Sequence, residues 1–180
     1  MQEGRWQVGK WFGVFGLAAT ASAAITGSVI GAIQLPHLHF TVWLLVGVGF
    51  VLALTDLSRG GKTPTIRRQT CATWWRTRGP WFAAIAWGID LGIGLTTIRV
   101  TSLYWFVLAV LLLGAGAPTG ALVLGAYGIG LTFGLALGLM ILSRRDAIHA
   151  NLQALQLSYV IRPVLAFALI IWCISTVITR

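Results

Sequence analysis

The chain has 180 residues, of which 57% are hydrophobic and only 9% are charged. Soluble domains carry about a quarter charged residues, so this composition excludes an ordinary globular domain and predicts an integral membrane protein. The net charge is +9, from 13 lysines and arginines against 4 acidic residues. Because these bases cluster in short connecting segments, they indicate membrane topology and anionic lipid headgroups rather than nucleic acid.

The apolar runs predict an all-α bundle of about six transmembrane helices in one domain, residues 1–180. Helical backbone is expected because a membrane barrel needs strands of alternating polarity, and these runs do not alternate. The first run resembles a secretory signal, but we expect it to remain as an uncleaved helix. The expected spans are 11–33, 40–57, 81–98, 102–114, 121–142 and 157–178.

The segment 58–80 carries six of the thirteen basic residues and therefore marks the cytoplasmic side of the plasma membrane, together with the N-terminus. We expect it to form a short interfacial helix whose tryptophans lie at headgroup depth and whose arginines face lipid phosphate. Those residues are Arg67, Arg68, Trp74, Trp75 and Arg76.

The number of spans depends on Arg144 and Arg145. Six spans place this pair outside the cell, which the positive-inside rule disfavours. If the short segment 102–114 is instead a re-entrant half-helix, five full spans remain and the pair lies inside. We take six spans as the first interpretation and five as the alternative.

Residues 47–60 and 128–145 resemble each other, since both begin with Gly-x-Gly and both contain Leu-Ser-Arg near the end. This likeness predicts two three-helix repeats, an arrangement in which transporters place a site at the repeat interface. Chance is the alternative explanation, because glycine and leucine are abundant in membrane helices.

Asp90 is the strongest functional signal, because it lies in the middle of an apolar span. There an ionised carboxylate costs at least about 2.5–3.5 kcal/mol. At about 100° per residue, Asp90 shares a helix face with Gly94 and Thr97. Gly88 and Gly92 lie on the opposite face, so one face can pack on a neighbouring helix while the other lines a pathway.

Two interpretations of Asp90 stay open. In the first, Asp90 is a site for a proton, a cation or the amine of a substrate. In the second, Asp90 forms a buried ion pair with Arg162 that locks two helices together. Arg162 lies in the last span, and its other expected place is the membrane interface.

Glycines at four-residue spacing predict close packing of helices in the first, third and fifth spans. These glycines are Gly27, Gly31, Gly88, Gly130, Gly134 and Gly138. The alternative is that Gly92-Ile-Gly94 and Gly128-Ile-Gly130 interrupt their helices and expose backbone groups to a solute at mid-membrane.

The remaining polar residues form no enzymatic constellation. No Ser/His/Asp set, paired carboxylates or phosphate-binding loop is present, so we do not expect an enzyme. His37 and His39 lack the neighbours of a metal site, so no metal or other cofactor is predicted. Asp56 lies three residues before Arg59, and we interpret the two as a local ion pair.

Three stretches carry a family resemblance: WGIDLGIGLTT from Trp87, the pair Tyr104-Trp105, and GAYGIG from Gly125. They resemble small actinobacterial membrane proteins grouped with the CcdA/DsbD-like and LysE-like transporters. The resemblance implies a bacterial plasma membrane, two inverted three-helix repeats, and transport of reducing equivalents or small solutes. The electron carriers have a cysteine in one span of each half. Here Cys173 lies in a span but Cys71 falls in the basic segment, which counts against the redox branch.

These features predict a small transporter, or half of one, for a solute or ion, with Asp90 as the binding or coupling acid. A chain of 180 residues needs a second copy or another subunit to enclose a path, so we expect a homo-oligomer or other membrane subunits. The alternative function is a non-catalytic accessory subunit of a larger membrane complex. In that case the glycine faces and the Asp90–Arg162 pair serve assembly.

Overall fold

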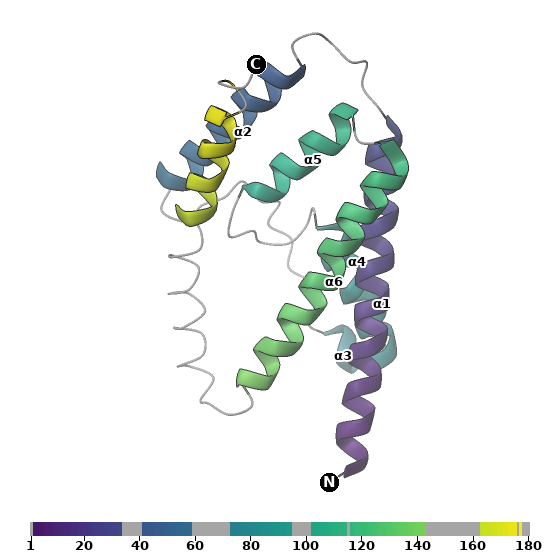
Figure 1. The fold of residues 1–180 in the computed structure, drawn as a ribbon. Helices are drawn as coiled ribbons and strands as arrows, with labels where there is room; N and C mark the ends of the chain where they lie inside the picture. The colour runs from purple at the N-terminus through teal and green to yellow at the C-terminus, as the bar shows by residue number, and fades with distance from the viewer. Residues whose placement is uncertain are drawn as a thin grey trace.

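The computed structural model describes residues 2–33, 41–58, 73–94, 102–114, 116–142, 163–175 and 177. These residues form seven helices and no strands, which confirms the predicted all-α class. The helices are α1 Gln2–Ile33, α2 Thr41–Ser58, α3 Trp74–Thr77, α4 Pro80–Ile93, α5 Leu103–Gly114, α6 Gly116–Leu142 and a C-terminal helix Pro163–Ser175 (Figure 1).

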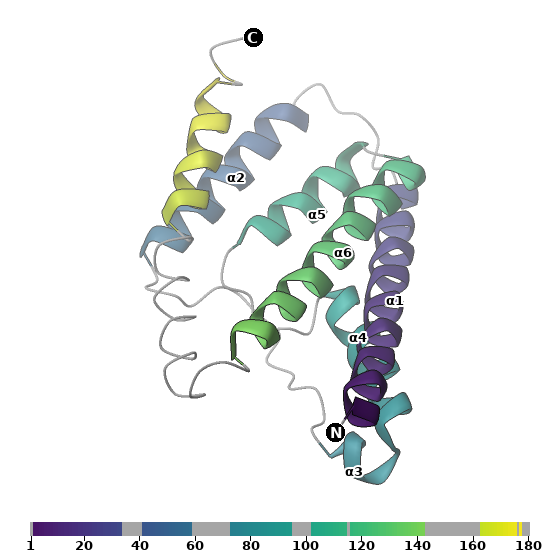
Figure 2. The same cartoon turned by 60° about the horizontal axis from the view of Figure 1, so that its bottom comes forward.

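α1 is the helix on which α4, α5 and α6 pack (Figure 2). α4 runs parallel to it, since Gly88 contacts Ala18 and the later Gly92 contacts Ser22. α6 runs antiparallel to α1. Its contacts follow the order Gly120 on Gly27, Gly125 on Ala24, Gly128 on Thr20 and Thr132 on Gly16.

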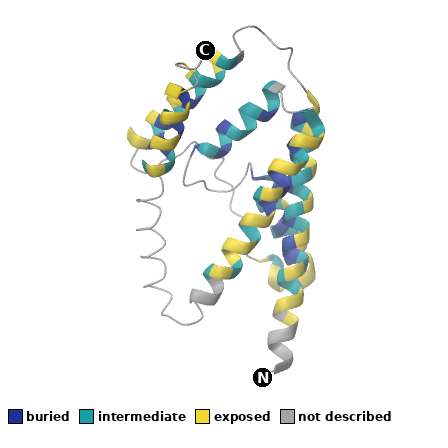
Figure 3. Cartoon of the chain, viewed as in Figure 1, coloured by how far each residue is buried: buried dark blue, intermediate teal, exposed yellow. Residues whose placement is uncertain are grey.

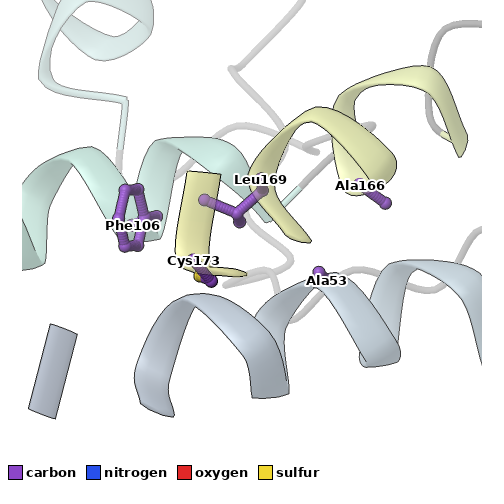
Figure 4. Close-up of a cluster of buried hydrophobic side chains, with 5 residues drawn as sticks. All are labelled: Ala53, Phe106, Ala166, Leu169 and Cys173. Atoms are coloured by element: carbon purple, nitrogen blue, oxygen red, sulfur yellow. The ribbon is translucent and has the colours of Figure 1, made fainter. Parts of the chain in front are cut away.

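α5 lies between two groups of helices. One face of α5 places Tyr104 and Leu111 in a buried cluster with Ala23 of α1 and Leu124 of α6. The opposite face places Phe106 in a second cluster with α2 and the C-terminal helix (Figure 4). The other members of that second cluster are Ala53, Ala166, Leu169 and Cys173.

Many residues on the outer surface of the helices are exposed (Figure 3), and they include many large hydrophobic side chains. Leu122 is 75% exposed, Leu17 74% and Phe133 70%. Large hydrophobic side chains gathered over such a surface are typical of contact with lipid or with another protein. Two helices are long and apolar enough to cross a membrane, Gly9–Ile33 of α1 and Gly116–Gly138 of α6. The described structure therefore supports association with a membrane.

Several helix bounds differ from the sequence prediction. α4 ends at Ile93, five residues before the expected end of the span at 98. α6 begins at Gly116 rather than at 121, so Pro118 falls in its first turn, where the missing proline N–H leaves no hydrogen bond unmade. Gly116 has a φ of 73°, and this left-handed conformation reverses the chain between α5 and α6.

Candidate functional site

α4 ends halfway along the apolar part of α1. That part, Gly9–Ile33, has 25 residues. Near its end α4 contacts α1 through Gly92, which lies against Ala19 and Ser22. At about 1.5 Å per residue, these two residues lie roughly 15–20 Å from the start of an apolar segment about 37 Å long. The end of α4 therefore lies at half depth if α1 crosses the bilayer.

Gly94 ends the helix. It has φ 71° and ψ −5°, the left-handed conformation that glycine adopts without a steric penalty, and its N–H donates to the Asp90 carbonyl at 3.4 Å. The helix thus ends at Gly92-Ile-Gly94, one of the two stretches where the sequence suggested an interruption. The other stretch differs, because α6 continues as helix through Gly128 and Gly130.

α5 begins beside the end of α4. The Tyr104 hydroxyl, in the first turn of α5, donates to the Ile93 carbonyl at 2.7 Å. The centroids of the Tyr104 and Tyr127 rings are 5.4 Å apart. Tyr127 directly precedes Gly128, the residue of α6 that packs against Thr20 in the middle of α1. From there α5 runs toward the start of α6. Only one residue separates the end of α5 at Gly114 from the start of α6 at Gly116. The end of α4 and the start of α5 therefore meet beside the middle of the apolar part of α1.

α4 and α5 are each too short to cross a membrane alone. α4 has 14 residues and α5 has 12. At about 1.5 Å per residue they measure roughly 21 Å and 18 Å, each about half the length of the apolar part of α1. α4 extends from the level of Trp11 to the middle of the apolar part of α1, and α5 begins there.

Asp90 lies in the last turn of α4, on the face opposite Gly88 and Gly92. Both glycines are buried against α1, whereas Asp90 is partly buried. One turn before the helix end, the Ser22 hydroxyl of α1 reaches the Ile89 carbonyl at 3.3 Å and the Ala19 carbonyl at 3.1 Å. The predicted partner Arg162 and the pathway residue Thr97 lie outside the described residues.

Asp56 is the residue whose surroundings sequence reasoning missed. Its side chain is only 8% exposed, and both carboxylate oxygens accept hydrogen bonds from Ser102. The Ser102 backbone N–H donates to Oδ2 and the hydroxyl donates to Oδ1, each at 2.7 Å. Arg59, the expected partner, lies outside the described residues. Serine directly before an apolar run is a helix-start signal, but nothing in the sequence connects that serine to Asp56.

The predicted packing glycines divide into two sets. Gly27, Gly31 and Gly88 lie so close to neighbouring backbone that a β-carbon does not fit. Among the described residues, no atom lies within 4 Å of a β-carbon placed at Gly130, Gly134 or Gly138. The α6 glycines that approach the α1 backbone closely are instead Gly120 and Gly128, and Gly125 makes an ordinary contact with Ala24.

The tryptophans of the basic segment lie at the level where the apolar part of α1 begins. Trp75 of α3 contacts Trp11 at 5.1 Å between ring centroids and Trp87 at 6.2 Å. Trp74 contacts Phe82, and Arg76 is exposed. Tryptophan rings at one level are typical of a membrane interface. Arg67 and Arg68 lie outside the described residues.

The described helices contain no group of three or more His, Cys, Asp or Glu side chains that suits a metal ion. Cys173 is buried beside α2, where its thiol lies 3.6 Å from the Val46 carbonyl. No protein-family model, curated protein or solved structure matches this chain. The resemblance to the CcdA/DsbD-like group therefore stays a prediction.

Proposed function

We propose that this protein is a small membrane transporter, or half of one, in which a solute or ion binds at the interruption between α4 and α5. The observation that carries the proposal is the meeting of two short helices beside the middle of the apolar part of α1, with Asp90 in the last turn of one of them. Transporters place their sites at such discontinuous helices, because the helix ends present unpaired backbone groups away from bulk water.

The electrostatics of the interruption favour a positively charged solute or group. The C-terminal end of a helix carries a partial negative charge, and α4 ends here one turn beyond an acid. An intramembrane carboxylate commonly marks an ion or substrate pathway. The proposed ligand class is thus a proton, a metal cation or the amine of a small solute.

The helix directions support five crossings, with α4 and α5 as the two halves of one. α1 and α4 run parallel, and α6 runs opposite to them. α2 runs opposite to α5, since Gly49 contacts Phe106 whereas the later Asp56 contacts Ser102. The C-terminal helix returns along α2, with Cys173 near its end contacting Val46 near the start of α2.

Five crossings also remove the conflict over Arg144 and Arg145. The segments 59–72 and 143–162 then fall on the same side as the N-terminus, which the positive-inside rule assigns to the cytoplasm. We propose five crossings in place of the six expected from the lengths of the apolar runs. The repeat of two three-helix halves is not part of this proposal.

The experiment is flux through the purified protein in liposomes that contain a pH-sensitive dye. A potassium diffusion potential drives protons or cations, and a gradient of methylamine supplies an amine. We expect flux with the unaltered chain and none with Asp90→Asn, at equal protein content. Asp146→Asn makes the same chemical change outside the described helices and should transport normally. Normal flux through Asp90→Asn would refute the proposal.

A second candidate function is a non-catalytic accessory subunit, and the open face of α6 favours it. Gly130, Gly134 and Gly138 follow one side of this helix without a neighbour in the described chain, and Phe133 is 70% exposed. A smooth glycine face admits close approach of another helix. Purification from native membranes in mild detergent tests this function. Other subunits should copurify with the unaltered chain and be lost in Gly134→Leu.

A further inference from the structure

We infer that Asp56 is a positioning residue of the proposed transport site: it fixes the start of α5 and thereby holds the Tyr104 hydroxyl on the end of α4. This inference rests on the proposed function, because it assigns a role within the same interruption. The sequence gives Asp56 no such role, since its nearest opposite charge is Arg59.

The first step is the capping of α5 by a residue of another helix. Ser102 is completely buried, and its carbonyl accepts the backbone N–H groups of Trp105 and Phe106 at 3.0 and 3.2 Å. Its own N–H and hydroxyl both donate to the Asp56 carboxylate. Hydrogen bonds to a charged acceptor are among the strongest in proteins, and a carboxylate at a helix N-terminus adds a favourable dipole interaction. Asp56 therefore fixes where α5 begins.

The second step leads across α5 to the interruption. Ser102 and Tyr104 are two residues apart, so at about 100° per residue they lie on opposite sides of the helix. Ser102 faces α2, whereas Tyr104 faces α1 and α6 and bonds the last carbonyl of α4. The first turn of α5 thus connects a bond on α2 to a bond on α4.

The third step is the effect on access. While Asp56 is hydrogen-bonded to Ser102, the Tyr104 hydroxyl donates its hydrogen bond to the Ile93 carbonyl. This carbonyl is a backbone group at the proposed site. If α5 loses its cap, the first turn is free to unwind and the hydroxyl leaves that carbonyl. Asp56 is thus the hydrogen-bonded connection between α2 and this end of α5.

The test measures access to a cysteine at the interruption. Ile93→Cys keeps the backbone carbonyl and is placed in the full chain with Cys71→Ser and Cys173→Ala. The protein is reconstituted in liposomes, and a small water-soluble thiol reagent is followed by mass spectrometry. We expect Asp56→Ala and Tyr104→Phe each to raise the labelling rate by at least about tenfold, because each breaks a bond in one linkage.

Three further variants separate positioning from general destabilisation. Asp56→Asn keeps an acceptor for the Ser102 N–H and should stay within about threefold of the parent. Phe106→Leu loosens the same α2–α5 contact without removing the cap and should label like the parent. The double variant Asp56→Ala/Tyr104→Phe should label no faster than either single variant, because the two residues act in series.

Equal labelling of the parent and Asp56→Ala, including no labelling of either, would overturn the inference. So would rates that multiply in the double variant, or equal rates for the Asn and Ala variants. If Asp56→Ala does not accumulate, Asp56→Leu, which also removes both acceptors, replaces it with the same expected result. Labelling needs no transport. Normal flux through Asp90→Asn therefore refutes the proposed function alone, and an unaltered labelling pattern refutes this inference alone.

Discussion

The contact between α1 and α6 predicts a sharp difference between two glycines of the same helix. A β-carbon at Gly120 collides with the backbone carbonyl of Gly27, whereas a β-carbon at Gly130 meets no described atom within 4 Å. Gly120→Ala should therefore destabilise the protein, and Gly130→Ala should not. Both changes add one methyl group to the interior of α6, so they differ only in what that methyl group meets.

The magnitude follows from the atoms involved. Overpacking costs about 1–3 kcal/mol when side chains can adjust, and at Gly120 the obstacle is backbone on a continuous helix. Alanine is also favoured over glycine within a helix by up to about 1 kcal/mol, and this gain applies equally to both variants. We expect the free energy of unfolding of Gly120→Ala to be about 1–3 kcal/mol lower than that of Gly130→Ala. At about 2–4 °C per kcal/mol for a chain of this length, the difference in Tm is roughly 2–12 °C.

Thermal unfolding in one detergent, followed by the near-UV signal of the tryptophans, measures the difference. The parent, Gly120→Ala and Gly130→Ala are compared at equal protein and detergent concentration. A Gly130→Ala protein that unfolds as early as Gly120→Ala would refute the packing argument. Equal stability of all three proteins would refute the close approach of α1 and α6.

Two further predictions concern the interruption and the topology. Gly94→Ala should lower the Tm, because a side chain at φ 71° costs about 1–2 kcal/mol. Gly94→Asn should lower the Tm less, because asparagine tolerates this conformation. Equal effects of the two substitutions would contradict the left-handed conformation at the end of α4. With five crossings, a cysteine introduced at Ser143 reacts with an impermeant reagent from the same side as one introduced at Gln2, and one introduced at Thr179 reacts from the opposite side. Reaction of positions 2 and 179 from one side and of position 143 from the other would instead support six crossings.

Composition alone was sufficient for the all-α class, because an apolar chain with few charges has helical backbone as its main solution in lipid. The two faces of α4 were also predictable. A 3.6-residue period places Gly88 and Gly92 opposite Asp90, and the structure packs those glycines on α1. These features depend on residues close together in the chain.

The features that sequence could not supply depend on residues far apart. Gly130-x-x-x-Gly134 and Gly27-x-x-x-Gly31 look alike in sequence, but only the second pair packs within the described chain, because a smooth face does not specify its neighbour. Asp56 and Ser102 are 46 residues apart, so local spacing favoured Arg59 as the partner of Asp56. The end of α4 could likewise not be predicted from the apolar run 81–98, because the run continues past Gly94 whether or not the helix does.

The most direct test of the central claim is to block the interruption chemically during transport. In the variant with Ile93→Cys as its single cysteine, quantitative modification with a bulky thiol reagent should stop flux in liposomes. Ile129→Cys is the matched control, because Ile129 adjoins Gly128 at the same depth and is 60% exposed on α6. Its modification should leave flux unchanged. Full flux through protein modified at position 93 would contradict a transport path between α4 and α5.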